Sequence, residues 1–509
     1  MLRQLLTFSL FALCTIKSAL GDTPSLQSIL ANNSIEIYFP GEPGYQNVSQ
    51  AFNLRLHFEP IAVAYPNTTE QVAELVKAGA FLQVPVTARS GGHSYAAYGL
   101  GGANGHLVID LANINEISVD NSTGVATIGT GNRIGDIAIA LFDQAGRALP
   151  HGTCSLIGIG GHASFGGYGF TSRQWGLTLD NVIGATVVLA NGTVVEASET
   201  QNPDLFWAVR GAAPSFGIVT HFNFTTYVAP AQPTFFSYYW SLPLEQAISG
   251  ISLYQNFSFS PSIPPEIGFE MDLTKGTNNG EILLNLVGSY YGSPDQYSAI
   301  VQPFLDAMPN QTAPAQVNVT SWLDNLVLLA GGPIASTPQS RASENNTFYA
   351  KSLTTPSDQP MSEEAITALA SWMSVEGWYT PTDWFVQLEL YGGNTSKIDT
   401  IPSNATAYFN RHDLWTIQFY TSSADAEPPF PREGFAFLDG LVASITANEP
   451  ESYAYGAYPN YVDPRLPPDA WHTLYFGSNF DRLRQIKTEL DPYGVFTFPQ
   501  SIPPYEPLL

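Results

Sequence analysis

The spacing of hydrophobic and polar positions changes several times in the first part of the chain, and each change predicts an element. Thr68 with Gln71 forms a capping-box pair before an apolar stripe within residues 72–76, which is typical of the start of an amphipathic helix. Residues 84–88 predict a short strand that ends in the turn 89–93, Arg-Ser-Gly-Gly-His. This turn presents backbone N–H groups beside a cationic side chain, which suits an anion such as pyrophosphate.

Later patterns predict sheets. Residues 181–190 and 193–195 predict two strands joined by the tight turn Asn191-Gly192, and residues 216–220 predict another strand. After about Tyr227, alternation of apolar and polar residues predicts long strands with one apolar and one polar face, at 267–273, 282–287, 385–391 and 416–420. We expect an antiparallel sheet whose apolar face is covered by helices such as 363–372, and a final helix and Pro-rich tail over 481–502.

Seven glycines crowd the segment from Gly152 to Gly169, a density that predicts neither a stable helix nor a stable strand. Such a backbone is expected where the chain closely approaches a bulky polar group. Residues 158–163 also match the dinucleotide fingerprint Gly-x-Gly-x-x-Ala, and Asp180 lies near the spacing of a ribose-binding acid. Because that fingerprint must open a helix and further glycines follow it, we expect no nicotinamide-binding Rossmann domain.

The N-terminus predicts secretion. Arg3 precedes an apolar run, and small residues follow at Ala19 and Gly21, so residues 1–21 are expected to be a cleaved signal peptide. No later stretch approaches the roughly 20 apolar residues of a membrane helix. Asn-x-Ser/Thr sequons predict a glycoprotein; they begin at Asn32, Asn47, Asn67, Asn121, Asn191, Asn223, Asn256, Asn310, Asn318, Asn345, Asn394 and Asn404.

Charge limits the partners that the protein can bind. The chain has 19 Lys and Arg against 44 Asp and Glu, and loss of Arg3 and Lys17 with the signal changes the net charge from −25 to −27. Nucleic acids and anionic membranes need clustered basic residues, so we expect neither, whereas a neutral or cationic partner is easier to accommodate. We also expect no metal site, because the histidines show neither His-x3-His nor His-Glu-x-x-His spacing.

One cysteine is expected in the secreted protein, because Cys14 leaves with the signal and Cys154 remains. Secreted proteins normally pair their cysteines or lack them. Taken alone, Cys154 is either a buried inert thiol or a functional group, and its neighbouring motifs must decide.

The chain resembles the berberine-bridge-enzyme-like group of the vanillyl-alcohol-oxidase flavoprotein superfamily. The motifs that carry the resemblance occur in order over nearly the whole mature chain, at residues 89–95, 151–154, 158–169, 179–182, 204–211 and 458–463. The resemblance implies an α+β fold with a two-part FAD-binding domain over residues 22–228 and 454–509. It also implies a substrate-binding domain inserted at 229–453, built on an antiparallel sheet covered by helices.

The resemblance further implies FAD attached at its 8α carbon to His93 and at its C6 to the sulfur of Cys154. Covalent attachment would explain a lone cysteine in an oxidising compartment. The other residues expected at the cofactor are Arg89, Ser90, Gly91, Gly92, Ser94, Gly158, Gly161, His162, Gly169, Asp180, Asn181, Ile218, Phe496 and Gln500.

The resemblance also indicates which residues act on the substrate. Tyr461, favoured over Tyr458, is expected to be the catalytic base, with Glu389 helping it to accept a proton. Gln387 and Glu389 share one strand face, and Gln418 lies on the matching face of a neighbouring strand. Without the resemblance, a solvated sheet face would be the simpler interpretation. The residues expected to bind substrate are Tyr95, Gln387, Gln418 and Tyr458.

The implied function is oxidation of the reducing-end C1 hydroxyl of a neutral oligosaccharide to a lactone. Electrons pass to O₂, giving H₂O₂, or to another acceptor. Ile157 stands at the position that gates oxygen, where a smaller valine suits an oxidase and a bulkier residue favours other acceptors, so both acceptors remain open. Two alternatives also remain: oxidation of a secondary-metabolite alcohol by the same chemistry, and a secreted glycan-binding protein without turnover.

Overall fold

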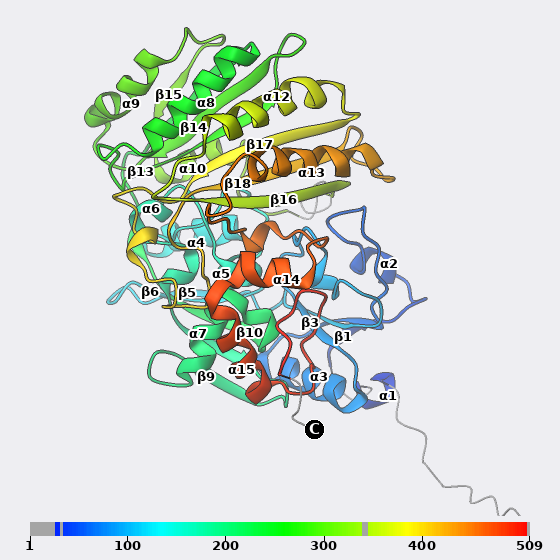
Figure 1. Ribbon diagram of the computed structural model, residues 1–509. Helices are drawn as coiled ribbons and strands as arrows, with labels where there is room; N and C mark the ends of the chain where they lie inside the picture. Colours follow the sequence, from blue (N-terminus) through cyan, green and yellow to red (C-terminus); the bar gives the residue numbers. More distant parts are fainter. Residues whose placement is uncertain (1–25, 31–33, 338–344, 506–509) are drawn as a thin grey trace, which may run out of the picture.

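The computed structural model describes residues 26–30, 34–337 and 345–505, so the predicted signal peptide lies outside the described residues. Figure 1 shows two bodies, a lower one built from the first part of the chain and an upper one built around a long sheet. The C-terminal segment returns to the lower body, where α15 (Phe480–Leu490) packs on α7 (Pro203–Ala212). Mixed sheets and helices of this kind confirm the predicted α+β fold.

Two sheets form the centre of the lower body. A four-stranded sheet has the order β1-β2-β4-β3, with β2 and β3 parallel to β4. Its strands are β1 (Glu36–Tyr38), β2 (Ala62–Tyr65), β3 (Val86–Arg89) and β4 (Leu107–Asp110). An antiparallel sheet has the order β5-β6-β10-β8-β9. Its strands are β5 (Ile117–Val119), β6 (Val125–Gly129), β8 (Val182–Val188), β9 (Val194–Ala197) and β10 (Ile218–Thr225).

Helix α3 (Thr69–Leu82) begins as its sequence predicts, with the Thr68 side chain accepting a hydrogen bond from the Gln71 N–H at 3.3 Å. The Gln71 side chain accepts from the Asn67 N–H, so the reciprocal bond is displaced by one residue from a standard capping box. The remaining helices of the lower body are α1 (Leu26–Leu30), α2 (Tyr45–Val48), α4 (Ile134–Ala145), α5 (Ile159–Phe165), α6 (Ser172–Trp175) and α14 (Pro468–Trp471).

A seven-stranded antiparallel sheet, in the order β15-β12-β14-β13-β17-β18-β16, forms the upper body. Its strands are β12 (Thr234–Leu242), β13 (Ile267–Lys275), β14 (Ile282–Tyr290), β15 (Gln316–Val319), β16 (Phe348–Pro356), β17 (Thr382–Leu390) and β18 (Asp413–Ser423). The other two short strands, β7 (Arg147–Ala148) and β11 (Tyr227–Val228), pair with each other.

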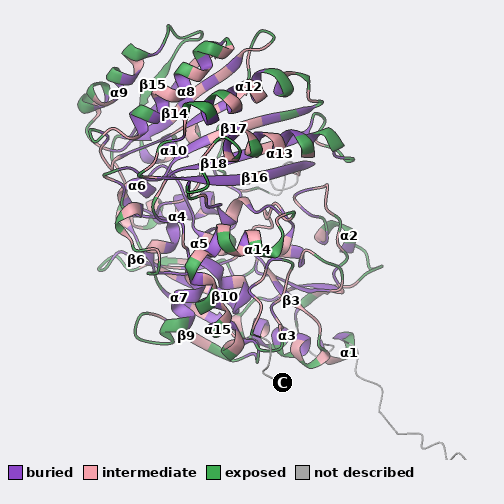
Figure 2. Cartoon of the chain, in the orientation of Figure 1, coloured by how far each residue is buried: buried purple, intermediate pink, exposed green. Residues whose placement is uncertain are grey.

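Helices cover the apolar face of this sheet. They are α8 (Leu244–Ser258), α12 (Glu363–Tyr379) and α13 (Arg432–Thr446), with α9 (Tyr297–Ala307) beside them. Helix α10 (Trp322–Leu329) lies on the other face, where Asn325 forms a hydrogen bond with Ser289 of β14 and Trp322 packs against the lower body. Trp240, Met271 and Leu284 from the strands pack with Leu369 and Leu441 from the helices in one core. The strands are mostly buried and the outward turns of the helices are exposed (Figure 2). The opposite, polar face of the sheet is directed to the lower body.

The glycine-rich segment departs from its prediction, because α5 forms within it. Gly158 caps the helix in an extended conformation, and Gly166 ends it with a φ of 147°. Tertiary contacts outweigh the poor helix propensity, since Ile159 and Ala163 are fully buried and α5 packs on α7. No parallel strand leads into α5, so a Rossmann unit is absent from this part of the described chain. None of the described helices is long and apolar enough to span a bilayer.

Candidate active site

A cavity of about 420 Å³ lies between the polar face of the upper sheet and the lower body. The turn after β3 supplies residues 90–94, and the glycine-rich segment supplies another wall. Strands β13, β17 and β18 form the roof, and residues 458–462 close one side. Segments far apart in the sequence therefore meet here, as the motifs predict.

His93 and Cys154 both line this cavity, and Cys154 is exposed within it. The His93 ring stacks on Phe52 with 4.3 Å between ring centroids. Burial, assisted by the positive charge of Arg133, lowers the pKa of His93 to about 3. The imidazole is therefore neutral at any working pH, and one ring nitrogen keeps a lone pair that can form a covalent bond.

Close backbone contact holds the two segments that carry these residues. A Cβ on Gly158 would lie 2.0 Å from the Gly91 nitrogen, so only glycine allows this approach. The Arg133 guanidinium donates hydrogen bonds to the carbonyl oxygens of Gly91 and Leu156 and so ties the turn of His93 to the segment of Cys154. No sequence motif indicated this role for Arg133, which stands just before α4.

The lining residues fit FAD. A Cβ on Gly161 would meet no atom within 4 Å, so the bare backbone leaves room on the cavity side. Among the described residues that line the cavity there is no Lys or Arg, so backbone N–H groups rather than cations would face the pyrophosphate. His162 accepts a hydrogen bond from the Gly152 N–H and supports the same loop.

The substrate side of the cavity centres on Tyr461 and Glu389, whose side chains are joined by a 2.7 Å hydrogen bond from the phenol to Oε1. Burial raises the pKa of Glu389 to about 8; the bond from Tyr461 lowers it, and the negative charge of Asp272 raises it further. Burial and the charge of Glu389 hold the pKa of Tyr461 well above its usual value. Glu389 is therefore the group in contact with Tyr461 that can take its proton.

The predicted sugar-binding side chains surround this pair. The Tyr95 ring stacks over Tyr461 with centroids 5.9 Å apart, and Gln418 Nε2 donates to the Tyr95 hydroxyl at 2.7 Å. Gln387 stands directly opposite Gln418 in the β17–β18 ladder, and both line the cavity. Alternation had predicted the shared face, and the structure adds the register.

Tyr458 also lines the cavity, but its hydroxyl oxygen has a different environment. It accepts hydrogen bonds from the N–H groups of Gly167 and Tyr168 and from the Asn460 side chain. Burial raises its pKa to about 12, and these bonds lower it. The phenol therefore braces the glycine-rich loop, and none of the described carboxylates forms a hydrogen bond with it. Of the remaining predicted residues, Ser90, Gly92, Ser94, Ile157, Gly169 and Gln500 line the cavity as well.

Five predicted cofactor residues are not among the residues that line the cavity. Arg89 is buried behind its turn, where its guanidinium is paired with Asp110 at 2.5 Å. Ile218 and Phe496 belong to the core around α3. Asp180 and Asn181 also lie outside the lining of the cavity, and the Asn181 side-chain amide donates hydrogen bonds to two backbone carbonyl oxygens.

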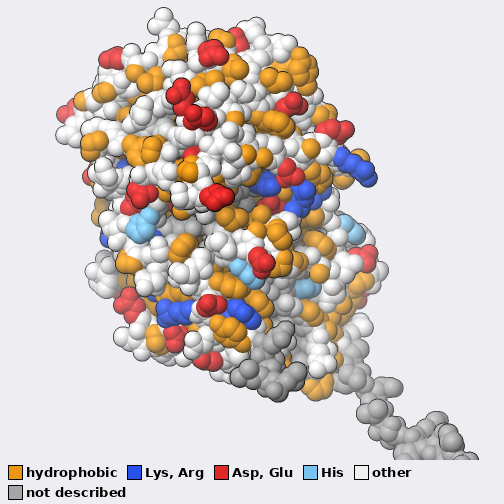
Figure 3. Space-filling model, in the orientation of Figure 1, with side chains coloured by type: hydrophobic (Ala, Val, Ile, Leu, Met, Phe, Trp, Pro, Cys, Tyr) orange, Lys and Arg blue, Asp and Glu red, His pale blue; other side chains and the backbone are white. Residues whose placement is uncertain are grey.

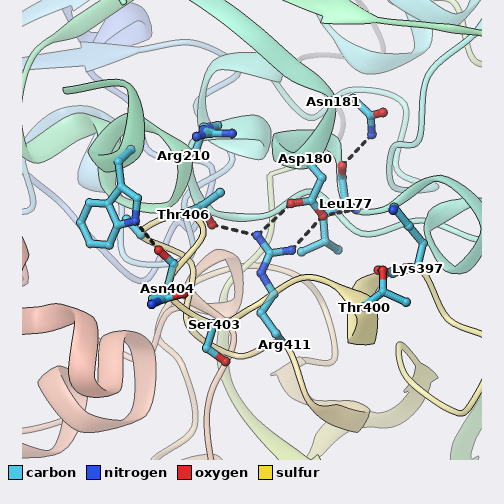
Figure 4. Close-up of polar contacts among 12 residues, drawn as sticks. Leu177, Asp180, Asn181, Arg210, Lys397, Thr400, Ser403, Asn404, Thr406 and Arg411 are labelled. Carbon is cyan, nitrogen blue, oxygen red and sulfur yellow. Dashed lines mark hydrogen bonds and ion pairs between the residues drawn. The ribbon is translucent and has the colours of Figure 1, made fainter. Parts of the chain in front are cut away.

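Figure 4 shows the surroundings of Asp180. Its carboxylate forms two 2.8 Å contacts with the Arg411 guanidinium, which also donates to Thr406. Asp180 also accepts a hydrogen bond from the Leu177 N–H, while the Asn181 amide donates to the Leu177 carbonyl oxygen. Arg411 lies in the loop between β17 and β18, so this buried ion pair connects the upper sheet to the lower body.

Two protein-family models and a known oxidase match this chain. The family model described as FAD binding domain matches residues 60–198, and that described as berberine and berberine like matches residues 457–503. A carbohydrate oxidase of Microdochium nivale is 36% identical and covers 94% of this chain and 95% of its own.

Two solved structures have closely similar folds. A chitooligosaccharide oxidase has a TM-score of 0.87 and 34% identity, with coverage of 94% of this chain and 100% of its own. The glucooligosaccharide oxidase from Acremonium strictum has a TM-score of 0.86 and 35% identity, with coverage of 94% and 99%. The latter is described as containing 6-S-cysteinyl, 8α-N1-histidyl FAD.

Proposed function

Because the chain belongs to the berberine-bridge-enzyme-like family of FAD-dependent oxidoreductases, we propose that it oxidises the reducing-end C1 hydroxyl of neutral oligosaccharides to lactones. Water then opens the lactone to an aldonic acid. FAD is held through bonds to His93 and Cys154.

The observation that carries this proposal is one cavity in which His93 and Cys154 face the hydrogen-bonded pair of Tyr461 and Glu389. Bound FAD supplies the two-electron acceptor that oxidation of an alcohol requires. Two covalent bonds would also keep the cofactor in place after secretion.

The side chains supply binding and proton transfer. In the proposed step, C1 loses a hydride, the C1 hydroxyl loses its proton, and a carbonyl double bond forms. Tyr461 takes the hydroxyl proton while its own proton passes to Glu389 across the 2.7 Å bond. Gln387 and Gln418 bind sugar hydroxyls from the roof of the cavity, and Tyr95 fixes Gln418.

Other features of the surface support a secreted enzyme with a neutral substrate. On the face seen in Figure 3, acidic side chains are spread over both bodies, and Lys and Arg form only small groups. Of the eleven sequon asparagines within the described ranges, nine are exposed, whereas Asn223 and Asn345 are partly buried. Exposure makes these nine accessible to glycosylation, as expected of a secreted glycoprotein. O₂ or another acceptor reoxidises the cofactor past Ile157.

Acid precipitation tests the two covalent bonds. The pellet of the purified protein should stay yellow, and the variants His93→Ala and Cys154→Ala should each retain covalently bound flavin. The double variant should release it into the supernatant. A wild-type pellet without colour would overturn the proposed attachment.

A sugar screen tests the reaction. Cello-, xylo-, chito- and malto-oligosaccharides are added anaerobically, and loss of flavin absorbance is recorded together with formation of aldonic acid. The matched control is the methyl glycoside of each active sugar, which lacks a free C1 hydroxyl and should cause no bleaching. If no sugar bleaches the flavin, or if methyl glycosides bleach it equally well, the proposal is wrong.

A further inference from the structure

A row of polar residues crosses the upper sheet at right angles to its strands. In the strand registers, Gln418 faces Gln387, Gln387 faces Asp272, Asp272 faces Asn285, and Asn285 faces Tyr239. Directly opposed residues point to the same side of a sheet. All five side chains therefore lie on the face that roofs the cavity, and they come from β18, β17, β13, β14 and β12 in turn.

Hydrogen bonds fix the side chains of this row. Gln387 Nε2 donates to Asp272 Oδ1 at 3.0 Å, and Asn285 Nδ2 donates to Asp272 Oδ2 at 3.4 Å. The Ser237 hydroxyl donates to Asn285 Oδ1 at 2.8 Å. Gln387 Nε2 also donates to Glu270 Oε1 at 3.3 Å, and Glu270 lines the cavity. A mobile, solvated sheet face would not hold its side chains in this connected pattern.

The row continues where the lining of the cavity ends. Gln387 and Gln418 line the cavity, whereas Asp272, Asn285 and Tyr239 lie outside its lining and are partly exposed. Three strand spacings separate Gln387 from Tyr239, about 14 Å at the usual distance between strands. This length accommodates more than one pyranose unit beyond the reacting end of a sugar chain.

The chemistry of these three residues suits a neutral carbohydrate. They offer a carboxylate, an amide and a phenol ring with a hydroxyl group. Such groups accept and donate hydrogen bonds to sugar hydroxyls, and the ring offers an apolar surface to a pyranose face. The Tyr239 hydroxyl makes no hydrogen bond to any described residue, and its neighbours Tyr238 and Trp240 are buried on the opposite face. The ring is thus directed toward a ligand or solvent.

We propose that Asp272, Asn285 and Tyr239 form a distal subsite that binds the second and later units of the oligosaccharide whose reducing end enters the cavity. This proposal rests on the proposed function. It makes the chain length of the substrate a property of strands β12 to β14, separate from the chemistry at Tyr461.

Chain-length dependence tests the subsite. In whichever of the four sugar series reduces the flavin fastest, kcat/KM is measured for the monosaccharide and for the tetrasaccharide. The variants are Asn285→Ala and Tyr239→Ala, because Asp272 also affects the pKa of Glu389. For each variant, kcat/KM for the tetrasaccharide should fall at least about fivefold, which is about 1 kcal/mol. The monosaccharide value should stay within about twofold of wild type.

A matched control lies on the other side of the sheet. Gln302→Ala changes an exposed residue of α9 and should affect neither sugar. An unchanged monosaccharide rate also shows that each variant is folded and contains its cofactor. If Tyr239→Ala loses activity on the monosaccharide, Tyr239→Phe, which keeps the ring, is measured in its place. The subsite is refuted if kcat/KM is the same for the two sugars in wild type and in both variants. It is also refuted if the variants lower kcat/KM equally for both sugars. If no sugar is oxidised by wild type, the proposed function fails first and the subsite with it.

Discussion

Replacing Glu389 with Gln should abolish the pH dependence of flavin reduction by sugar. Burial raises the pKa of Glu389 to about 8 despite the hydrogen bond from Tyr461. Only the ionised carboxylate can receive a proton from Tyr461, so the wild-type reduction rate should rise with pH and level off above about 8.

The magnitude follows from that pKa. At pH 6, two units below it, on the order of 1% of Glu389 is ionised, because the ratio changes tenfold per unit. The wild-type rate at pH 6 should therefore be about 100-fold below its plateau. Glu389→Gln cannot accept the proton at any pH, so its rate should be about 10²-fold or more below the wild-type plateau and nearly independent of pH.

Anaerobic stopped-flow mixing at saturating sugar, from about pH 5.5 to 9.5, measures both effects. Asp383→Asn is the matched control, since it makes the same change of acid to amide at an exposed position on β17 and should retain the wild-type profile. A wild-type rate that is flat over this range would refute the reasoning. A Glu389→Gln profile that still rises with a midpoint near 8 would assign the titration to another group.

Three further predictions concern oxygen, pH and stability. Ile157→Val should raise reoxidation by O₂ about tenfold or more if the wild-type enzyme reacts slowly, while anaerobic reduction stays within about threefold; stopped-flow traces with equal oxygen rates would reject the gate. Burial raises the pKa of Asp399 and Asp413 to about 7, so the folded state keeps protons that the unfolded chain releases, and stability is lost as pH rises from about 4 through 7. In differential scanning fluorimetry the Tm should be higher at pH 5 than at pH 8, and the reverse order would contradict this. Arg411→Leu should destabilise the protein by about 3–5 kcal/mol, because the Asp180 carboxylate stays buried without its partner; an unchanged Tm would contradict this.

The elements that sequence patterns predicted best are those with a single dominant period. Alternation placed Gln387 and Glu389 on one face because every second side chain of a strand points the same way. It could not place Gln387 opposite Gln418, since register depends on pairing between strands that are separated by the loop 391–412.

Long-range contacts explain the other differences. Helix α5 forms in a segment of poor helix propensity because Ile159 and Ala163 are buried against the rest of the lower body. The resemblance places Asp180 near the cofactor, and no sequence pattern could reveal its ion-pair partner Arg411, which is 231 residues away in the sequence. Arg133 carries no motif at all, and only the positions of Gly91 and Leu156 reveal its function.

The buried pair of Asp180 and Arg411 also affects how a sugar reaches the cavity. Opening the cleft by a hinge motion would separate two charges that are now almost fully shielded from water. Breaking such a pair costs several kcal/mol, which makes the open conformer a rare species. The sugar is therefore expected to enter the cavity without separation of the two bodies. Turnover should then not depend on a domain-closure step of the kind that limits many enzymes with lids.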